Sequence, residues 1–294
     1  MASRTRRLTA AFASALLAST AVMAATATTA DARSRSVTTA TYAPASTAKI
    51  HPGTMMYTDG AQCTANFVYT DGAGNTYVGY AAHCAGTGAA TDTDGCTTQS
   101  LPLGTKVDFV EGGSLVSSGT RVGGGTLVYS SWLAMQQAGT TDANTCAYND
   151  LALVKVDAAD VGKVNPSVPF WGGPTGLSTS GTAAGDSVYS YGNSSLRAGI
   201  SALSPKRGTS LGDDGDGWSH TVYTVTPGIP GDSGSGFMDA SGKALGVLST
   251  VAIAPLAGSN GVGDLAKELA FAQSHSGISG LALVPGTEPF NPVL

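Results

Sequence analysis

Short hydrophobic runs alternate with turn signals along most of this chain. Runs rich in valine, tyrosine, phenylalanine and leucine occur at 65–69, 76–81, 106–110 and 151–156. Asp-Gly, Gly-Asn and Gly-Gly pairs separate them, and such pairs favour tight hairpin turns. The pattern predicts strands and hairpins from about residue 50 to 164, and a second β-rich block from about 175 to 251.

The segment 165–174 divides the two blocks. It contains three prolines and a Gly-Gly pair. Proline lacks the N–H that a central strand needs, so this segment is expected to be a linker. The predicted domains are therefore an N-terminal β unit at 50–164 and a C-terminal unit at 175–294.

One helix is predicted near the C-terminus. Asp264 is a suitable N-cap, and Leu265, Leu269 and Ala272 follow at the spacing of one helical face. Gly277 lies just past the expected end of the helix.

The first 32 residues have the features of an export signal. Three early arginines precede a Leu- and Ala-rich run from 8 to 25, and small residues at 30–32 suit signal cleavage. The following stretch, 33–49, is rich in Ser, Thr and Ala and is expected to be a flexible leader or short pro-segment. Folded structure is predicted to begin near Ile50.

Composition and charge narrow the range of functions. The chain has 294 residues, of which 42% are hydrophobic and only 12% charged. Loss of 1–32 removes three arginines and one aspartate, which takes the formal charge from −5 to −7. An acidic chain without a basic run does not suit nucleic-acid binding. We expect a secreted monomer with no membrane contact after signal removal.

Four cysteines fit two disulfides in an exported protein, although the count permits three pairings. Zinc binding is the alternative, but the chain has no C-x-x-C spacing to support it.

Three short motifs carry the candidate chemistry. Ser233 lies in the glycine-rich run 231–236, where a tight turn can expose its hydroxyl and leave backbone N–H groups free. His83 lies in the run Ala-Ala-His-Cys at 81–84, and Asp150 begins the run Asp-Leu-Ala-Leu at 150–153. The chain order is histidine, aspartate, serine.

These motifs and their order resemble those of the chymotrypsin-like (trypsin-fold) serine proteases, in particular the bacterial secreted branch. The resemblance extends from His83 to Ser233. It implies an all-β fold of two antiparallel six-stranded β-barrels, with a short C-terminal helix and an active site in the cleft between the barrels. His83 and Asp150 would come from the first barrel and Ser233 from the second.

The resemblance also implies a role for each residue. Ser233 would be the nucleophile, His83 its general base, and Asp150 the anion that orients His83. The backbone N–H groups of Gly231 and Ser233 would form the oxyanion hole for a polypeptide substrate. No metal or organic cofactor is expected.

A disulfide between Cys63 and Cys84 is carried over from the same family. A second between Cys96 and Cys146 is favoured because Cys96 follows the His83 loop and Cys146 precedes Asp150.

Substrate preference follows from the same carry-over. Pro227, six residues before Ser233, would stand at the base of the primary pocket and brings no carboxylate for Arg or Lys. The segment Ser249, Thr250 and Val251 would pair with the substrate backbone. Cleavage after small or medium apolar residues is expected. Leu248 stands where glutamate-specific relatives have a histidine, which argues against cleavage after glutamate.

The chain departs from the family at two places. Gly-Ser-Gly follows Ser233 instead of Gly-Gly-Pro, and the segment at 50–53 lacks the I-V-G-G start of animal zymogens. Pairing of Asp232 with a freed N-terminus is therefore in question, and its partner is left open.

Two other functions compete with proteolysis. One is a catalytically inactive binding protein of the same fold. The other is an α/β-hydrolase esterase that would use Ser233, Asp264 and His275, but position 235 is serine where that family's motif has glycine. His51, His220 and His275 are interpreted as structural histidines, and the acidic runs at 92–95 and 212–217 as solvated turns.

Overall fold

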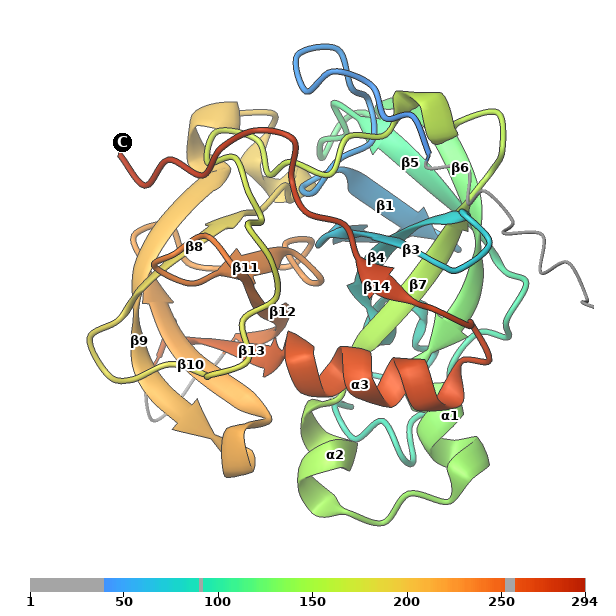
Figure 1. Cartoon of the computed structure of the whole chain (residues 1–294), viewed down its shortest axis with the longest axis vertical. Helices are drawn as coiled ribbons and strands as arrows, with labels where there is room; N and C mark the ends of the chain where they lie inside the picture. The colour runs from blue at the N-terminus through green and yellow to red at the C-terminus, as the bar shows by residue number, and fades with distance from the viewer. Residues whose placement is uncertain (1–39, 90–91, 252–256, 294) are drawn as a thin grey trace, which may run out of the picture. The chain divides into compact units, whose positions relative to one another are not determined.

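Antiparallel strands make up most of the described chain, which comprises residues 40–89, 92–251 and 257–293 of the computed structural model (Figure 1). These residues belong to one folded unit, Val37–Leu294. The predicted export signal at 1–32 and the first part of the leader lie outside the described residues. Within them, no helix has the length and hydrophobicity to cross a membrane.

The N-terminal half forms an antiparallel sheet of eight strands, in the order β14-β3-β4-β7-β6-β5-β1-β2. The strands are β1 (Met55–Thr58), β2 (Ala61–Thr64), β3 (Val68–Thr70), β4 (Thr76–Ala81), β5 (Lys106–Glu111), β6 (Thr120–Ser130), β7 (Leu151–Val156) and β14 (Ala282–Leu283).

The C-terminal half forms a closed barrel in the order β10-β13-β12-β11-β8-β9. Its strands are β8 (Ser187–Tyr191), β9 (Pro205–Asp214), β10 (Ser219–Thr224), β11 (Gly236–Met238), β12 (Ala244–Val251) and β13 (Asn260–Asp264).

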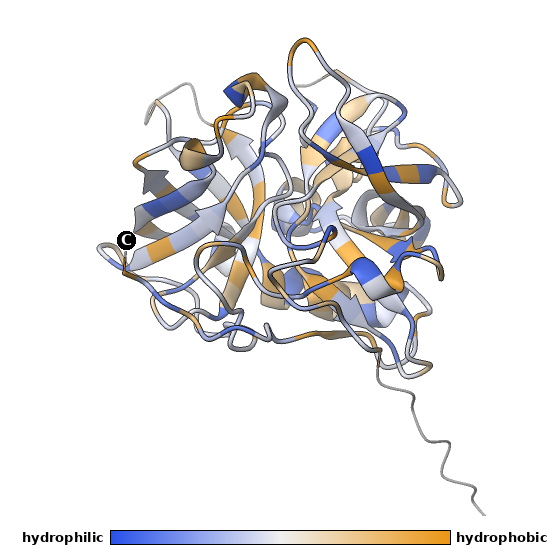
Figure 2. Cartoon of the chain, turned by 90° about the horizontal axis from the view of Figure 1, so that it is seen from above, coloured by the Kyte–Doolittle hydropathy of each residue, from blue (hydrophilic) through white to orange (hydrophobic). Residues whose placement is uncertain are grey.

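Turn chemistry and side-chain burial explain these strands. Asp59 and Gly60 join β1 to β2, and both have positive φ, as a two-residue hairpin turn of type I′ requires. Every residue of β4 is buried, as expected for a strand covered on both faces. Hydrophobic and polar segments alternate along the strands (Figure 2).

The helices are α1 (Ser131–Ala138), α2 (Ala143–Tyr148) and α3 (Leu265–His275). The predicted helix is α3, and Asp264 caps it by accepting a 2.8 Å hydrogen bond from Lys267 N. Leu265, Leu269 and Ala272 are buried as expected. Helix α3 contacts β12 and β13 of the barrel as well as β7 and α1 of the N-terminal half (Figure 1).

The expected all-β class with a short C-terminal helix is confirmed, and the C-terminal barrel has the expected six strands. The N-terminal sheet differs from the expectation because it has eight strands. One of them, β14, comes from the chain's C-terminal segment and pairs with β3.

Backbone contacts also precede Ile50. Ala43 N donates to Val164 O at 2.8 Å, and Ile50 pairs with Val164 in a parallel bridge. Residues 43–49 thus lie along the segment 163–164, which follows β7, whereas a pro-segment at 33–49 and the mature N-terminus stay predictions.

Candidate active site

Strand register brings His83 to Asp150. Strands β4 and β7 are antiparallel neighbours in which Ala81 is opposite Leu151. The residues just past the end of β4 therefore lie beside the residue just before β7. Ala82 N donates to Asp150 O at 2.8 Å, and His83 lies in the 3₁₀ turn Ala82–Ala85 that follows.

The carboxylate of Asp150 orients the imidazole of His83. Asp150 Oδ2 lies 2.7 Å from His83 Nδ1, and Oδ1 accepts a 2.8 Å bond from His83 N. With Nδ1–H donating to Asp150, His83 Nε2 is the nitrogen left to accept a proton. Burial disfavours the imidazolium, but the charge and hydrogen bond of Asp150 outweigh it, so the pKa of His83 is raised.

Ser249 holds the same carboxylate from the second barrel. Its Oγ donates a 2.6 Å hydrogen bond to Asp150 Oδ2. Asp150 is 3% exposed, so these bonds replace the water that a carboxylate would otherwise bind. The sequence analysis predicts that Ser249 belongs to the segment that pairs with the substrate backbone. It does not predict the hydrogen bond from the Ser249 side chain to Asp150.

The turn that carries Ser233 is fastened to strand β2 of the other half. Thr64 N donates to Ser233 O at 2.8 Å, and Thr64 Oγ1 donates to Gly231 O at 2.7 Å. Gln62 Nε2 adds a 3.0 Å bond to Gly231 O. These bonds cross between the two β units and bring the serine turn to the His83 side.

Glycine is required on both sides of Ser233. Gly231 has φ +96°, and a Cβ there would collide with Gln62 Oε1. Gly234 has φ +87°, and its Cβ would lie 2.6 Å from Thr64 O and 2.7 Å from Ala81 N. Only glycine lets the serine turn approach β2 and β4 this closely.

The two N–H groups expected to form an oxyanion hole are available. In the described part of the chain, the N–H groups of Gly231 and Ser233 donate to no protein acceptor. The carbonyls of both residues are bonded from β2, which fixes the direction of the turn. Two fixed and unused donors can bind an anionic oxygen.

His83, Asp150 and Ser233 line one cavity of about 610 Å³ between the two β units. Trp132, Cys63 and Cys84 contribute from the N-terminal side, and Ile229, Pro230 and Leu248 from the barrel. Among the hydrogen bonds of the described residues, none joins Ser233 to His83. Such a contact is often loose before substrate binds.

The predicted substrate strand forms one wall of this cavity, because Ser249, Thr250 and Val251 all line it. Thr250 and Val251 pair with β13 on one side. On the other side the backbone hydrogen bonds of β12 end at Leu248, which bonds to Gly234 and Ser235. One edge of Ser249–Val251 is thus unpaired within the described chain. Pro227 does not line the cavity, and its carbonyl accepts bonds from Arg197 and Lys206.

The partner of Asp232 is a pair of cations. Asp232 Oδ2 lies 2.6 Å from Arg197 Nη2 and 3.0 Å from Lys206 Nζ. The three side chains are at most 8% exposed. Burial lowers the pKa of Lys206 and so does Arg197, while the charge of Asp232 acts in the opposite direction. Both cations are distant from Asp232 in the sequence. No local motif therefore predicts that they pair with it.

Both disulfides form as expected. Cys63 pairs with Cys84, next to His83, and Cys96 pairs with Cys146. Within the described residues, two groups of side chains bring three potential metal ligands close together: Cys63, His83 and Cys84, and Asp94, Cys96 and Cys146. Each group contains one of these disulfides. Their sulfurs carry no thiolate for a metal, so these groups do not fit a metal centre.

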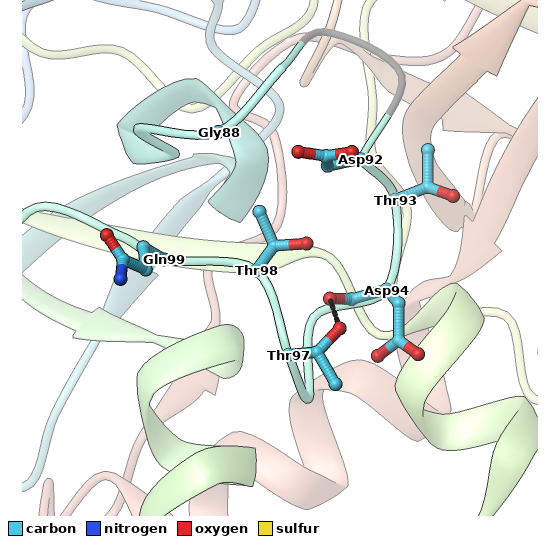
Figure 3. A pocket seen from close by; sticks show the side chains of 7 residues that line it. All are labelled: Gly88, Asp92, Thr93, Asp94, Thr97, Thr98 and Gln99. Carbon is cyan, nitrogen blue, oxygen red and sulfur yellow. Dashed lines mark hydrogen bonds between the residues drawn. The ribbon is translucent and has the colours of Figure 1, made fainter.

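A polar hollow of about 600 Å³ adjoins the cavity and is lined by Gly88, residues 92–94 and residues 97–99 (Figure 3). Its two carboxylates are engaged within the loop. Asp92 accepts a 2.8 Å bond from Ala89 N, and Asp94 accepts a 2.9 Å bond from Cys96 N. These bonds support the interpretation of 92–95 as a turn.

The esterase alternative does not fit the fold. The strand ladders are antiparallel, whereas an α/β-hydrolase needs a mostly parallel sheet.

His220, one of the three histidines interpreted as structural, lies buried between Asp213 at 2.7 Å and Asp264 at 3.1 Å.

Comparisons with known proteins are limited to distant structural likeness. No protein-family model matches the sequence, and no curated protein is similar to it. Thermobifida fusca protease A aligns over 81% of this chain and 99% of its own, with 18% identity and a TM-score of 0.48. A Nocardiopsis protease aligns over 80% and 98%, with 18% identity and a TM-score of 0.45. Cellulomonas bogoriensis chymotrypsin covers 80% and 98%, with 17% identity and a TM-score of 0.44.

At these identities and TM-scores the alignments decide nothing about the activity of this chain. Its fold is defined by its own strand order and by the six-stranded closed barrel. The residues His83, Asp150 and Ser233 of the three motifs line one cavity of this fold. The chain has the chymotrypsin-like fold, with the closed six-stranded barrel as one unit and the eight-stranded antiparallel sheet as the other.

Proposed function

We propose that this chain is a secreted serine endopeptidase that cleaves peptide bonds through Ser233, His83 and Asp150. The observation that carries the proposal is the 2.7 Å contact between His83 Nδ1 and Asp150, beside the same cavity as Ser233. An imidazole with one nitrogen fixed to a buried carboxylate can act as a base at the other.

The proposed reaction has two halves. Ser233 Oγ attacks the scissile carbonyl while His83 Nε2 takes its proton, and the N–H groups of Gly231 and Ser233 bind the oxygen that becomes negative. His83 then gives the proton to the leaving amine, and an acyl-enzyme remains on Ser233. Water, deprotonated by His83, releases the acid and restores the serine.

The unpaired edge of Ser249–Val251 supports the binding of an extended polypeptide by β-addition. Leu248, Ile229 and Val251 give the adjoining cavity wall an apolar character. These side chains favour a small or medium apolar residue before the cleaved bond. Pro227 has no part in this proposal because it does not line the cavity.

Activation is proposed to proceed without an N-terminal ion pair. Asp232 already has two buried cationic partners, Arg197 and Lys206. A freed α-amino group is therefore not needed to hold the serine turn. Two disulfides favour an exported enzyme, and the proposed enzyme acts as a monomer without a cofactor.

Ser233→Ala and His83→Ala test the proposal. Each is expected to lower kcat on a peptide substrate by at least about 10⁴-fold while the thermal unfolding midpoint stays near that of the wild type. Ser241→Ala and His275→Gln are matched controls, because both residues are exposed. If either active-site variant kept most of its kcat, the mechanism would be wrong.

Specificity needs a separate measurement. Cleavage of a peptide library is expected to give products ending mainly in Ala, Val or similar side chains. Preferred cleavage after Arg, Lys or Glu would contradict the proposed specificity of the pocket. It would not contradict the proposed roles of Ser233, His83 and Asp150.

A further inference from the structure

A buried carboxyl group lies directly behind Asp150. Glu268, on α3, has no exposed surface, and its Oε1 accepts a 2.9 Å hydrogen bond from Asp150 N. Asp150 is thus held at its carboxylate by His83 and Ser249, and at its main chain by Glu268. Nothing in the proposed reaction uses Glu268.

The second oxygen of Glu268 has no partner in the described chain. Oε2 is fully buried. The hydroxyl of Tyr129 on β6 is likewise buried and has no hydrogen-bond partner among the described residues. A buried carboxylate with one unbonded oxygen is far more costly than a neutral carboxylic acid in the same place. Oε1 accepts from Asp150, so the acid proton belongs on Oε2.

The surroundings of Glu268 oppose a negative charge. Asp150 faces it from the start of β7, and Asp264 from the N-cap of its own helix. Tyr69 of β3 and Tyr129 of β6 also lie close enough for a charge on Glu268 to raise their pKa values. Burial raises the pKa of Glu268 well above its usual range, and the two aspartates raise it further, against the bond from Asp150 N.

We propose that Glu268 is a positioning residue of the active site, which as a neutral acid fixes the main chain of Asp150 without adding a charge beside His83. This inference depends on the proposed function, because it concerns the same triad. An ionised Glu268 would add a second anion behind Asp150 and raise the pKa of His83. Less neutral imidazole would then be available as the base at neutral pH.

Three variants separate the possibilities. Glu268→Gln keeps an oxygen acceptor for Asp150 N and places a donor where the acid proton was. Glu268→Leu removes the acceptor at similar volume. Glu111→Gln is the control, because Glu111 is a half-exposed glutamate on the N-terminal sheet that pairs with Lys49.

The readout is the pH dependence of kcat/KM on a peptide substrate, from pH 5 to 10. Glu268→Gln and Glu111→Gln are expected to keep kcat/KM within about twofold and to leave the acidic limb, which reports His83, in place. Glu268→Leu is expected to lower kcat by about tenfold or more with little change in KM, because Asp150 N loses its acceptor.

Infrared spectroscopy gives a second readout that does not need activity. The wild type is expected to show at pH 7 a carbonyl band of a protonated carboxylic acid, which is lost in Glu268→Gln. An acidic limb shifted to lower pH in Glu268→Gln, absence of the band, or full kcat in Glu268→Leu would overturn the inference. An inactive wild type would instead refute the proposed function, so the two failures are distinguishable.

Discussion

Arg197 Nη2 lies 2.6 Å from Asp232 Oδ2, and both side chains are shielded from solvent. Asp232 immediately precedes the proposed nucleophile, so this ion pair fixes the turn that presents Ser233. Ser194 N and Ile229 N also donate to the carboxylate of Asp232, at 3.0 and 3.2 Å. The serine turn is therefore held from within the C-terminal barrel through Asp232, in addition to the bonds that Gln62 and Thr64 make to it from β2.

The second cation of this cluster should stabilise the fold. Lys206→Met keeps most of the side-chain length but removes one of the two cations that pair with Asp232. We predict that it lowers the free energy of unfolding by about 2 kcal/mol, since a buried charge loses one partner. Urea denaturation would measure this. Lys243→Met is the control, because Lys243 is exposed; an equal effect of both variants would show that the buried pair contributes nothing.

Ser249 should support catalysis through Asp150. Ser249→Ala removes the 2.6 Å bond to Oδ2, and a bond to a charged acceptor contributes about 1.5–3 kcal/mol. We predict a fall in kcat of at least about tenfold with KM nearly unchanged. Steady-state kinetics on a peptide substrate checks this against Ser180→Ala, an exposed serine. A loss confined to KM would assign Ser249 to substrate binding instead.

The disulfide between Cys96 and Cys146 should stabilise the region that leads into Asp150. Its cysteines are 50 residues apart, and loop entropy gives an upper estimate of about 4 kcal/mol for such a link. The double variant Cys96→Ser with Cys146→Ser is predicted to lower the thermal midpoint by several degrees or more. An unchanged midpoint in calorimetry would contradict this.

His220 should make stability depend on pH. Burial opposes its charge, but hydrogen bonds to Asp264 and Asp213 outweigh burial, so its pKa is raised above 6.5. A raised folded-state pKa stabilises the fold fully below pH 6.5, and this contribution is lost as the pH rises through the folded value.

The test compares urea unfolding of the wild type and His220→Asn from pH 5.5 to 9. The difference between their free energies of unfolding is predicted to shrink as the pH rises. His83 also has a raised pKa, but it is present in both proteins and cancels. A difference that is constant across this range would mean that the charge of His220 is not involved.

Much of the fold could be predicted because its signals are local. Strands β4 and β7 occupy the predicted positions, 76–81 and 151–156, and Asp264 caps α3 as expected. The helices α1 and α2 were missed. Helix α2 has only six residues, too few to show a helical period, although Asp142 is a capping residue at its start. Helix α1 follows the strand pattern of β6 directly and has no N-cap hydrogen bond from a side chain.

The contacts around the site were less accessible from sequence. Arg197 and Lys206 reach Asp232 because β8 pairs with both β9 and β11, and no local sequence pattern encodes those pairings. Glu268 did have a signal. It lies three residues after Leu265, on the face that also buries Leu269 and Ala272, and a charged residue on an apolar helical face is unusual.

The convergence of Ser233, His83 and Asp150 is the central claim, and covalent labelling with a fluorophosphonate tests it most directly. Mass spectrometry of the labelled wild type is predicted to find one adduct, on Ser233. The labelling rate should fall by at least about 100-fold in His83→Ala, because the base that activates the hydroxyl is gone. An unlabelled Ser233 in the wild type, or an equal rate in His83→Ala, would contradict the account.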